Sequence, residues 1–212
     1  MRNIPIFTTE FGAASLILKE IPYTKTAFIQ IQSSFMPEEL LRECVDFCRV
    51  VGAEKIYATG DPYLEKFPLY TQVVCMYVLK NDLEKTEAAA VSVTDETASL
   101  WQEIYNRRMR DVDNAAYMCD SDVRQMQKDK DGYFIYDQHT LIGIGRASGN
   151  QIRAIASEVP GRGKDTLLAL ADVLQEERIF LEVASTNSRA IRLYKALGFG
   201  EKTVLFQWYK II

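Results

Sequence analysis

Histidine is almost absent from this chain of 212 residues, and cysteine is scarce. The sequence contains one histidine, His139, and four cysteines, Cys44, Cys48, Cys75 and Cys119. No CxxC pair occurs, so the ligand spacing typical of a structural zinc site is missing. Cys44 and Cys48 lie four apart on a predicted helix and could form a redox pair or half of a metal site. Two small buried side chains in a reducing compartment fit them better, and we expect no metal.

Long apolar runs and an excess of basic residues are also missing. No apolar run reaches the ~18 residues that a membrane-spanning helix needs. The residues after Arg2 lack the apolar region and cleavage site of a signal peptide. The net charge of −4 argues against a nucleic-acid surface, which would need a clustered basic face. We therefore expect a cytoplasmic protein whose partners include neither nucleic acid nor a membrane.

The composition of the chain, with 48% hydrophobic and 25% charged residues, is that of an ordinary globular protein. Sequence patterns of strands and helices alternate along it. The N-terminal half predicts two short strands before residue 22, a strand at 26–33, an amphipathic helix at 37–51, a strand at 55–59 and a strand at 71–80. A polar interval then follows, which we interpret as a linker. It divides the chain into domains 1–88 and 89–212.

The C-terminal half predicts a longer series of elements. Thr94 or Asp95 can cap a helix up to residue 110, and a second helix covers 120–130. Further expected elements are strands at 133–137, 140–148 and 151–158, a helix at 166–178, a strand at 179–183, a helix at 188–197 and a strand at 204–212. The fold class is therefore α/β, with a mixed, mostly antiparallel sheet flanked by helices and a smaller α/β half in front of it.

The most specific stretch is residues 180–199, FLEVASTNSRAIRLYKALGF. An apolar strand leads to Asn187, a good helix N-cap, and Gly198 follows the helix where a residue tolerant of positive φ is favoured. On this unit Glu182 lies on the strand, and Tyr194 lies about two turns after Asn187 on the same side of the helix.

The string LEV-x3-N-x2-AI-x-LY-x3-GF in this stretch resembles a helix motif of the GNAT superfamily of acetyl-CoA-dependent N-acetyltransferases. The element order over residues 90–212 is similar to that family's core. The resemblance implies transfer of an acetyl group from acetyl-CoA to a primary amine by direct attack. The acceptor would be a small-molecule or peptide amine, and the motif is most similar to that of enzymes acetylating N-terminal amines of proteins.

The resemblance also implies roles for individual residues. Tyr194 would donate to the departing CoA thiolate, although an aromatic ring filling the core is the alternative. Asn187 would bind the CoA arm while capping its helix. Glu182 would be the base, or else a plain surface carboxylate, and Glu158 is a competing base. The acceptor groove would lie along residues 101–117.

The cofactor loop of the family, Q/R-x-x-G-x-G/A, can be aligned in two registers. Counting from Arg162 places Asp165 and Leu167 at the two glycine positions. Asp165 would then be an N-cap whose carboxylate occupies the N–H groups meant for pyrophosphate and repels its charge. Under this register, cofactor binding would be impaired.

Counting from Glu158 places Gly161 and Gly163 correctly but puts a glutamate at the Q/R position. In this register the loop from Val159 to Gly163 would bind the cofactor, and Arg162 and Lys164 could meet its phosphates. The sequence leaves both registers open. The alternative function is therefore a non-catalytic module that binds acyl-CoA weakly or serves as a sensor or assembly domain.

A faint internal repeat relates residues 26–80 to residues 151–210, because both read strand, helix, strand, short helix, strand. Chance similarity between α/β segments explains the match equally well. If the repeat is real, the first copy has kept the scaffold and lost the glycine loop. The N-terminal half could then complete the sheet or form a homodimer contact.

Overall fold

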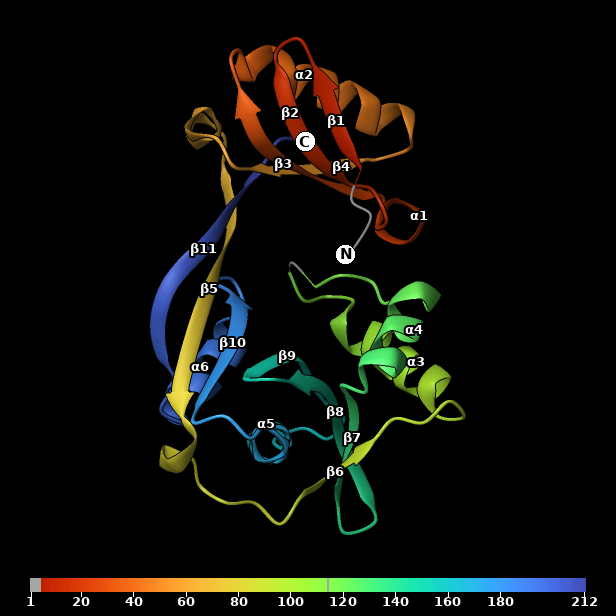
Figure 1. The fold of residues 1–212 in the computed structure, drawn as a ribbon, viewed down its shortest axis with the longest axis vertical. Coiled ribbons are helices and arrows are strands. Elements are labelled where there is room, and N and C mark those ends of the chain that lie inside the picture. The colour runs from red at the N-terminus through yellow and green to blue at the C-terminus, as the bar shows by residue number, and fades with distance from the viewer. Residues whose placement is uncertain (1–4, 114) are drawn as a thin grey trace. The chain divides into compact units, whose positions relative to one another are not determined.

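The computed structural model describes residues 5–113 and 115–212, and these divide into two compact units (Figure 1). Unit 1 comprises Met1–Val73 and Val204–Ile212, and unit 2 comprises Val74–Thr203. This division differs from the predicted boundary between residues 88 and 89. The reason is that two long strands, β5 (Leu69–Leu79) and β11 (Gly200–Lys210), each belong partly to both units.

Unit 1 is a sheet with one long helix packed on it. Its elements are β1 (Ile6–Thr9), β2 (Gly12–Ile17), α1 (Ile21–Thr24), β3 (Thr26–Ser34), α2 (Pro37–Val50), β4 (Lys55–Thr59) and the 3₁₀ turn η1 (Pro62–Lys66). The strand order is β1-β2-β3-β4-β11, with β3 and β4 parallel and the other pairs antiparallel. Cys44 and Cys48 of α2 are both fully buried in the core against this sheet, together with Leu40.

Unit 2 contains the remaining elements: η2 (Lys80–Asp82), β6 (Ala89–Ser92), α3 (Ala98–Met109), α4 (Asp120–Asp129), β7 (Gly132–Asp137), β8 (Thr140–Ser148), β9 (Gln151–Ser157), α5 (Gly163–Val173), β10 (Arg178–Ala184) and α6 (Ser188–Ala196). Its strand order is β5-β10-β9-β8-β7-β6. Strands β6 to β9 are antiparallel neighbours, and β9 and β10 are parallel. The mixed, mostly antiparallel sheet predicted from the sequence is confirmed.

Helices cover two faces of the unit 2 sheet. Leu167 and Leu170 of α5, with Tyr194 of α6 and Leu197 at its C-cap, share one core with residues of β5 and β10. On the other face, α3 and α4 form a separate core with β7 to β9, centred on the fully buried Trp101. Among the described residues, the core formed by α3 and α4 reaches as far as β9 and includes no residue of β10 or β5.

Two details of unit 2 differ from the sequence prediction. Helix α3 begins at Ala98 after Thr97, later than predicted. The reason is that Thr94 and Thr97 bond each other in a turn: the Thr97 N–H donates to the Thr94 carbonyl oxygen at 3.2 Å. Strand β6 was not predicted at all, because its residues are alanine-rich and lie in the polar interval. Among the described helices, none is long and apolar enough to cross a membrane.

Candidate active site

Strands β9 and β10 separate after a short paired segment. Their register pairs are Phe180 with Gln151 and Leu181 with Ile152, and no further pair joins them within the described part of the chain. A shift in the β8–β9 register at this level leaves Arg153 as an extra residue of β9. The edges of β9 and β10 that face each other beyond this point therefore have backbone N–H and C=O groups available to an extended ligand.

Helix α5 starts directly beyond this opening. Gly161 supplies the turn before it, with a φ of 86° that favours glycine. The helix begins at Gly163, and its first backbone bond runs from the Thr166 N–H to the Arg162 carbonyl oxygen at 3.0 Å. In the described part of the chain no side-chain hydrogen bond caps the helix at Arg162, so the N–H groups of residues 163–165 are available to an anion. This is the geometry of the register counted from Glu158.

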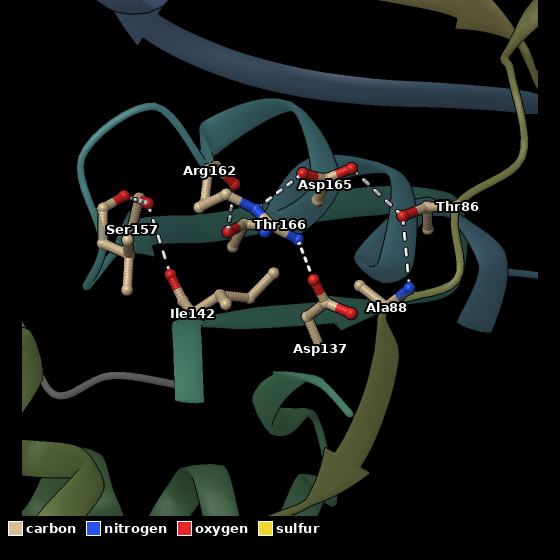
Figure 2. A network of polar contacts seen from close by, with 9 residues as sticks. Thr86, Ala88, Asp137, Ile142, Ser157, Arg162, Asp165 and Thr166 are labelled. Atoms are coloured by element: carbon tan, nitrogen blue, oxygen red, sulfur yellow. Dashed lines mark hydrogen bonds and ion pairs between the residues drawn. The ribbon is translucent and has the colours of Figure 1, made fainter. Parts of the chain in front are cut away.

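The prediction that Asp165 is an N-cap is wrong. Arg162 holds the N-cap position, and Asp165 lies in the first turn. Its carboxylate accepts a hydrogen bond from Arg162 Nε at 2.9 Å and another from the Thr86 hydroxyl at 3.3 Å, as Figure 2 shows. These partners hold the carboxylate outside the helix end, so it does not occupy the N–H groups meant for pyrophosphate.

The two basic residues predicted to meet phosphates are already paired. Arg162 Nη2 donates to Asp137 Oδ2 at 2.5 Å, on the side opposite to Asp165 (Figure 2). The hydrogen bond to Asp137 raises the pKa of Arg162 above its usual value. Lys164 Nζ donates to Glu84 Oε2 at 2.6 Å on the surface. Any phosphate at this site would compete with these carboxylates for the two cations.

Tyr194 lies on α6, close to the start of α5. A Cβ atom placed on Gly163 would lie 3.1 Å from Leu193 Cδ2, so the two helices are in contact there. The Tyr194 ring is 6% exposed and lies against Phe199, with ring centroids 5.9 Å apart. Burial raises the pKa of Tyr194 to about 12. Among the described residues none forms a hydrogen bond with the Tyr194 hydroxyl. The hydroxyl oxygen is not fully buried.

Asn187 caps α6 as the sequence predicts. Its Oδ1 accepts a hydrogen bond from the Ala190 N–H at 3.1 Å. This bond uses one side-chain oxygen and leaves the amide nitrogen for a ligand. The capping role and the predicted cofactor role are thus compatible.

The two candidate bases have different surroundings. Glu182 is exposed and accepts one hydrogen bond, from Gln151 Nε2 at 3.1 Å. Glu158 lies beyond the other end of β9, and both of its carboxylate oxygens are taken. Arg107 Nη2 donates to Oε2 at 2.7 Å, and Arg108 Nε donates to Oε1 at 2.5 Å. The structure does not bring the two glutamates together, and among the described contacts Glu182 Oε2 has no partner, whereas both oxygens of Glu158 are bound by arginine.

Two aromatic residues of the predicted acceptor groove, Trp101 and Tyr105, belong to the core instead. Trp101 is fully buried and donates from Nε1 to the Tyr133 carbonyl oxygen at 3.0 Å, and Tyr105 stacks on it. The arginines of the same helix, Arg107 and Arg108, hold the start of the cofactor loop through Glu158. We call these two ion pairs of Arg107 and Arg108 with Glu158 the arginine clamp. No local sequence pattern indicates it.

Comparisons with known proteins give structural matches only. No protein-family model matches the sequence, and no curated protein sequence matches it. A GCN5-related N-acetyltransferase (GNAT) from Sphaerobacter thermophilus superposes with a TM-score of 0.59 at 11% identity, over 93% of this chain and 75% of that one. This chain has the GNAT fold.

Two further structures with similar scores extend the match. A protein of unknown function from Staphylococcus epidermidis covers 99% of this chain and 94% of its own, with a TM-score of 0.60 and 13% identity. A tandem GNAT protein from the clavulanic acid biosynthesis pathway matches 94% of this chain and 78% of its own, at a TM-score of 0.51 and 14% identity. In this chain the predicted site residues lie on α5, β10 and α6, in the loop between β9 and α5, and at the N-cap of α6.

Proposed function

We propose that this protein transfers an acetyl group from acetyl-CoA to a primary amine, which attacks the thioester directly. The observation that carries the proposal is the opening between β9 and β10, which ends at the uncapped start of α5 beside Tyr194. The opening offers backbone groups to an extended amide chain, and the helix start offers N–H groups to phosphates.

The loop fits such a cofactor. A Cβ atom on Gly161 would meet nothing within 4 Å, so this side of the loop is open. The amides of residues 163–165, with the backbone from Val159 to Gly161, would hold the pyrophosphate. The free edge of β9 and the Asn187 amide would hold the pantetheine arm. Acetyl-CoA supplies the activated acetyl group.

Tyr194 and Glu182 have complementary roles in the proposed reaction. Glu182 accepts a proton from the ammonium form of the acceptor, directly or through water. Tyr194 stays protonated, because its pKa of about 12 is far above neutral pH. An alkyl thiol has a pKa of about 8.5, so the phenol stabilises the leaving thiolate by a hydrogen bond and keeps its own proton. Glu158 is a poorer base, because two guanidinium groups occupy its oxygens.

A second function, acyl-CoA sensing without catalysis, has a specific observation in its favour. Both cations of the cofactor loop are bound to carboxylates, Arg162 to Asp137 and Asp165 and Lys164 to Glu84. These carboxylates weaken the attraction of the loop for phosphates. Weak cofactor binding would suit a sensor better than an enzyme.

Cofactor binding and acetyl release distinguish the two functions. Thermal unfolding is measured with and without acetyl-CoA, because a ligand at about 100 times its Kd stabilises the native state by about 2.7 kcal/mol. A panel of alkylamines and N-terminal peptides is then tested for CoA release. If the protein is an enzyme, we expect both a thermal shift with acetyl-CoA and CoA release with at least one amine. A shift without release across the panel favours the sensor, and no shift at millimolar acetyl-CoA contradicts both.

A further inference from the structure

An ammonium group of the chain itself lies over strand β10 of the unit 2 sheet. Lys202 Nζ is positioned 4.8 Å from the centroid of the Phe180 ring. In the strand order, β5 lies between β11 and β10, so the Lys202 side chain crosses over β5 to reach this ring. Tyr77 of β5 borders the same ring, with centroids 6.0 Å apart.

Opposite charges act on the same thiol at this place. Burial raises the pKa of the Cys75 thiol, the positive charge of Lys202 lowers it, and the negative charge of Glu182 raises it. The ammonium and the carboxylate therefore both lie near Cys75 on β5. An aromatic ring face together with a carboxylate is a favourable environment for an alkylammonium ion.

This ammonium lies beside the point where β9 and β10 part. Phe180 belongs to the first register pair of the two strands, Leu181 to the last, and Glu182 follows at the start of the opening. On the opposite face, Leu181 and Val183 are buried in the core under α5 and α6. The face on which Lys202 lies is therefore the side from which an acceptor amine would approach Glu182.

We infer that Lys202 is a self-acetylation site of this protein, an inference that rests on the proposed function. The Lys202 ammonium gives one proton to Glu182, and its nitrogen attacks the thioester carbonyl carbon. The C–S bond breaks, CoA leaves as the thiolate, and the nitrogen loses a second proton as the amide forms. The products are acetyl-Lys202, CoA and one proton. Because the amine is tethered, the step needs no external acceptor and gains from its high effective concentration.

Self-acetylation also changes the acceptor face. The amide has no charge, so it no longer competes for the Phe180 ring or for Glu182. An external alkylammonium ion can then take the same place. The acetylated protein is expected to bind such acceptors more tightly than the unmodified one.

The test follows acetylation of the full-length protein by acetyl-CoA alone. Intact mass and peptide mapping are expected to show one acetyl group on Lys202, formed with a rate constant independent of protein concentration. Lys202→Arg should abolish the modification, and Tyr194→Phe should slow it at least tenfold. Lys195→Arg is the matched control, since Lys195 is paired with Glu201 at 2.7 Å on the surface of α6, and it should leave the rate unchanged.

The outcomes separate the inference from the proposed function. Acetylation of added amines without modification of Lys202 overturns the inference and leaves the proposed function standing. Equal labelling of Lys202 in native, Tyr194→Phe and urea-unfolded protein indicates plain chemical acetylation and also overturns it. Absence of both thermal shift and transfer to any amine contradicts the proposed function itself.

Discussion

Tyr194 combines a buried ring with a hydroxyl that no described residue binds and that is not fully buried, so this hydroxyl is available to a ligand. Replacing Tyr194 by Phe keeps the packing against Phe199 and removes only the donor. We expect kcat to fall by about 10²-fold, with little change in the KM for acetyl-CoA or in the thermal midpoint. Steady-state kinetics and thermal unfolding measure the two effects.

Tyr209→Phe serves as the matched control, because the Tyr209 hydroxyl lies in unit 1, 3.4 Å from Gln207. It should leave kcat unchanged. If Tyr194→Phe keeps full turnover, Tyr194 is a core aromatic, as the alternative interpretation of the sequence had it. A fall in the thermal midpoint with unchanged kcat would point to the same conclusion.

The two buried thiols of unit 1 should make the stability of the native state depend on pH. Burial raises the pKa of Cys44 to about 12 and that of Cys48 to about 11. Both values exceed the ~8.5 of an exposed thiol, so the native state holds protons that the unfolded state releases. The resulting stability is fully present below about pH 8.5 and is lost as pH rises toward 11 and 12.

At pH 8.5 we expect a thiol-labelling reagent to modify Cys75 and Cys119, which are partly exposed, much faster than Cys44 and Cys48. Mass spectrometry of the labelled peptides measures each rate, and unfolding in denaturant should equalise them. Rapid native labelling of Cys44 or Cys48 would revive their interpretation as a redox pair.

Sequence patterns predicted the local features of the site and missed the distant ones. Asn187 as a helix cap and the strand carrying Glu182 follow from neighbouring residues. The arginine clamp on Glu158 joins residues 50 and 51 positions apart, and the Arg162–Asp137 pair joins residues 25 apart. Such pairs depend on the folded sheet. The mistaken N-cap at Asp165 has the same cause, since Arg162 and Thr86 outcompete the helix end for its carboxylate.

At the scale of elements, the cofactor loop is held between α5 and the end of β7. Arg162 bridges Asp137 and Asp165, and Thr166 donates to the Arg162 carbonyl oxygen at 2.8 Å. These contacts fix the loop, and they set the single positive charge of Arg162 against two carboxylates. The affinity of the loop for phosphates is limited by the carboxylates and can be raised by removing one of them.

Asp137→Asn is expected to strengthen acetyl-CoA binding by about 3- to 10-fold, equivalent to roughly 0.6–1.4 kcal/mol. The substitution leaves a hydrogen-bond acceptor for Arg162 and releases its positive charge to the phosphates. Titration calorimetry at two salt concentrations measures the effect, which should shrink at high salt. Asp129→Asn at the exposed end of α4 is the control, and weaker binding by Asp137→Asn would instead show that the ion pair shapes the loop.

Unit 1, like unit 2, contains two parallel neighbouring strands joined through a helix, but its pair does not separate after two residue pairs. Its β3 and β4 are parallel and stay paired from Thr26 with Lys55 to Gln30 with Thr59. Just beyond β4, a Cβ atom on Gly60 would lie 2.2 Å from the Ile31 carbonyl oxygen. The glycine therefore allows the backbone to stay in close contact with β3 here, whereas β9 and β10 of unit 2 separate after their paired segment. No room for a cofactor arm remains between these strands. That the N-terminal half is a degenerate copy of the C-terminal half stays a prediction.

At the scale of the whole molecule, each half of the chain ends in a strand that serves the other half's sheet. β5 follows the elements of unit 1 and is the neighbour of β10 in unit 2. β11 follows the elements of unit 2 and pairs with β4, at Tyr209 with Ala58 and Lys210 with Tyr57. The sequence predicted both strands, but pairing between distant strands could not be inferred from periodicity. A cut between residues 88 and 89 therefore leaves both halves incomplete.

The fragment 89–212 alone is accordingly expected not to fold cooperatively. It lacks β5, and with it Val74, Met76 and Val78, which lie in the same core as Leu181 and Tyr194. Its β10 would expose an unpaired edge, which favours aggregation. Mixing it with the separately expressed fragment 1–88 should restore a cooperative thermal transition, followed by circular dichroism, because each fragment then supplies the strand that the other needs. Cooperative unfolding of 89–212 by itself would show that this half is an independent domain and that the strand exchange adds little to its stability.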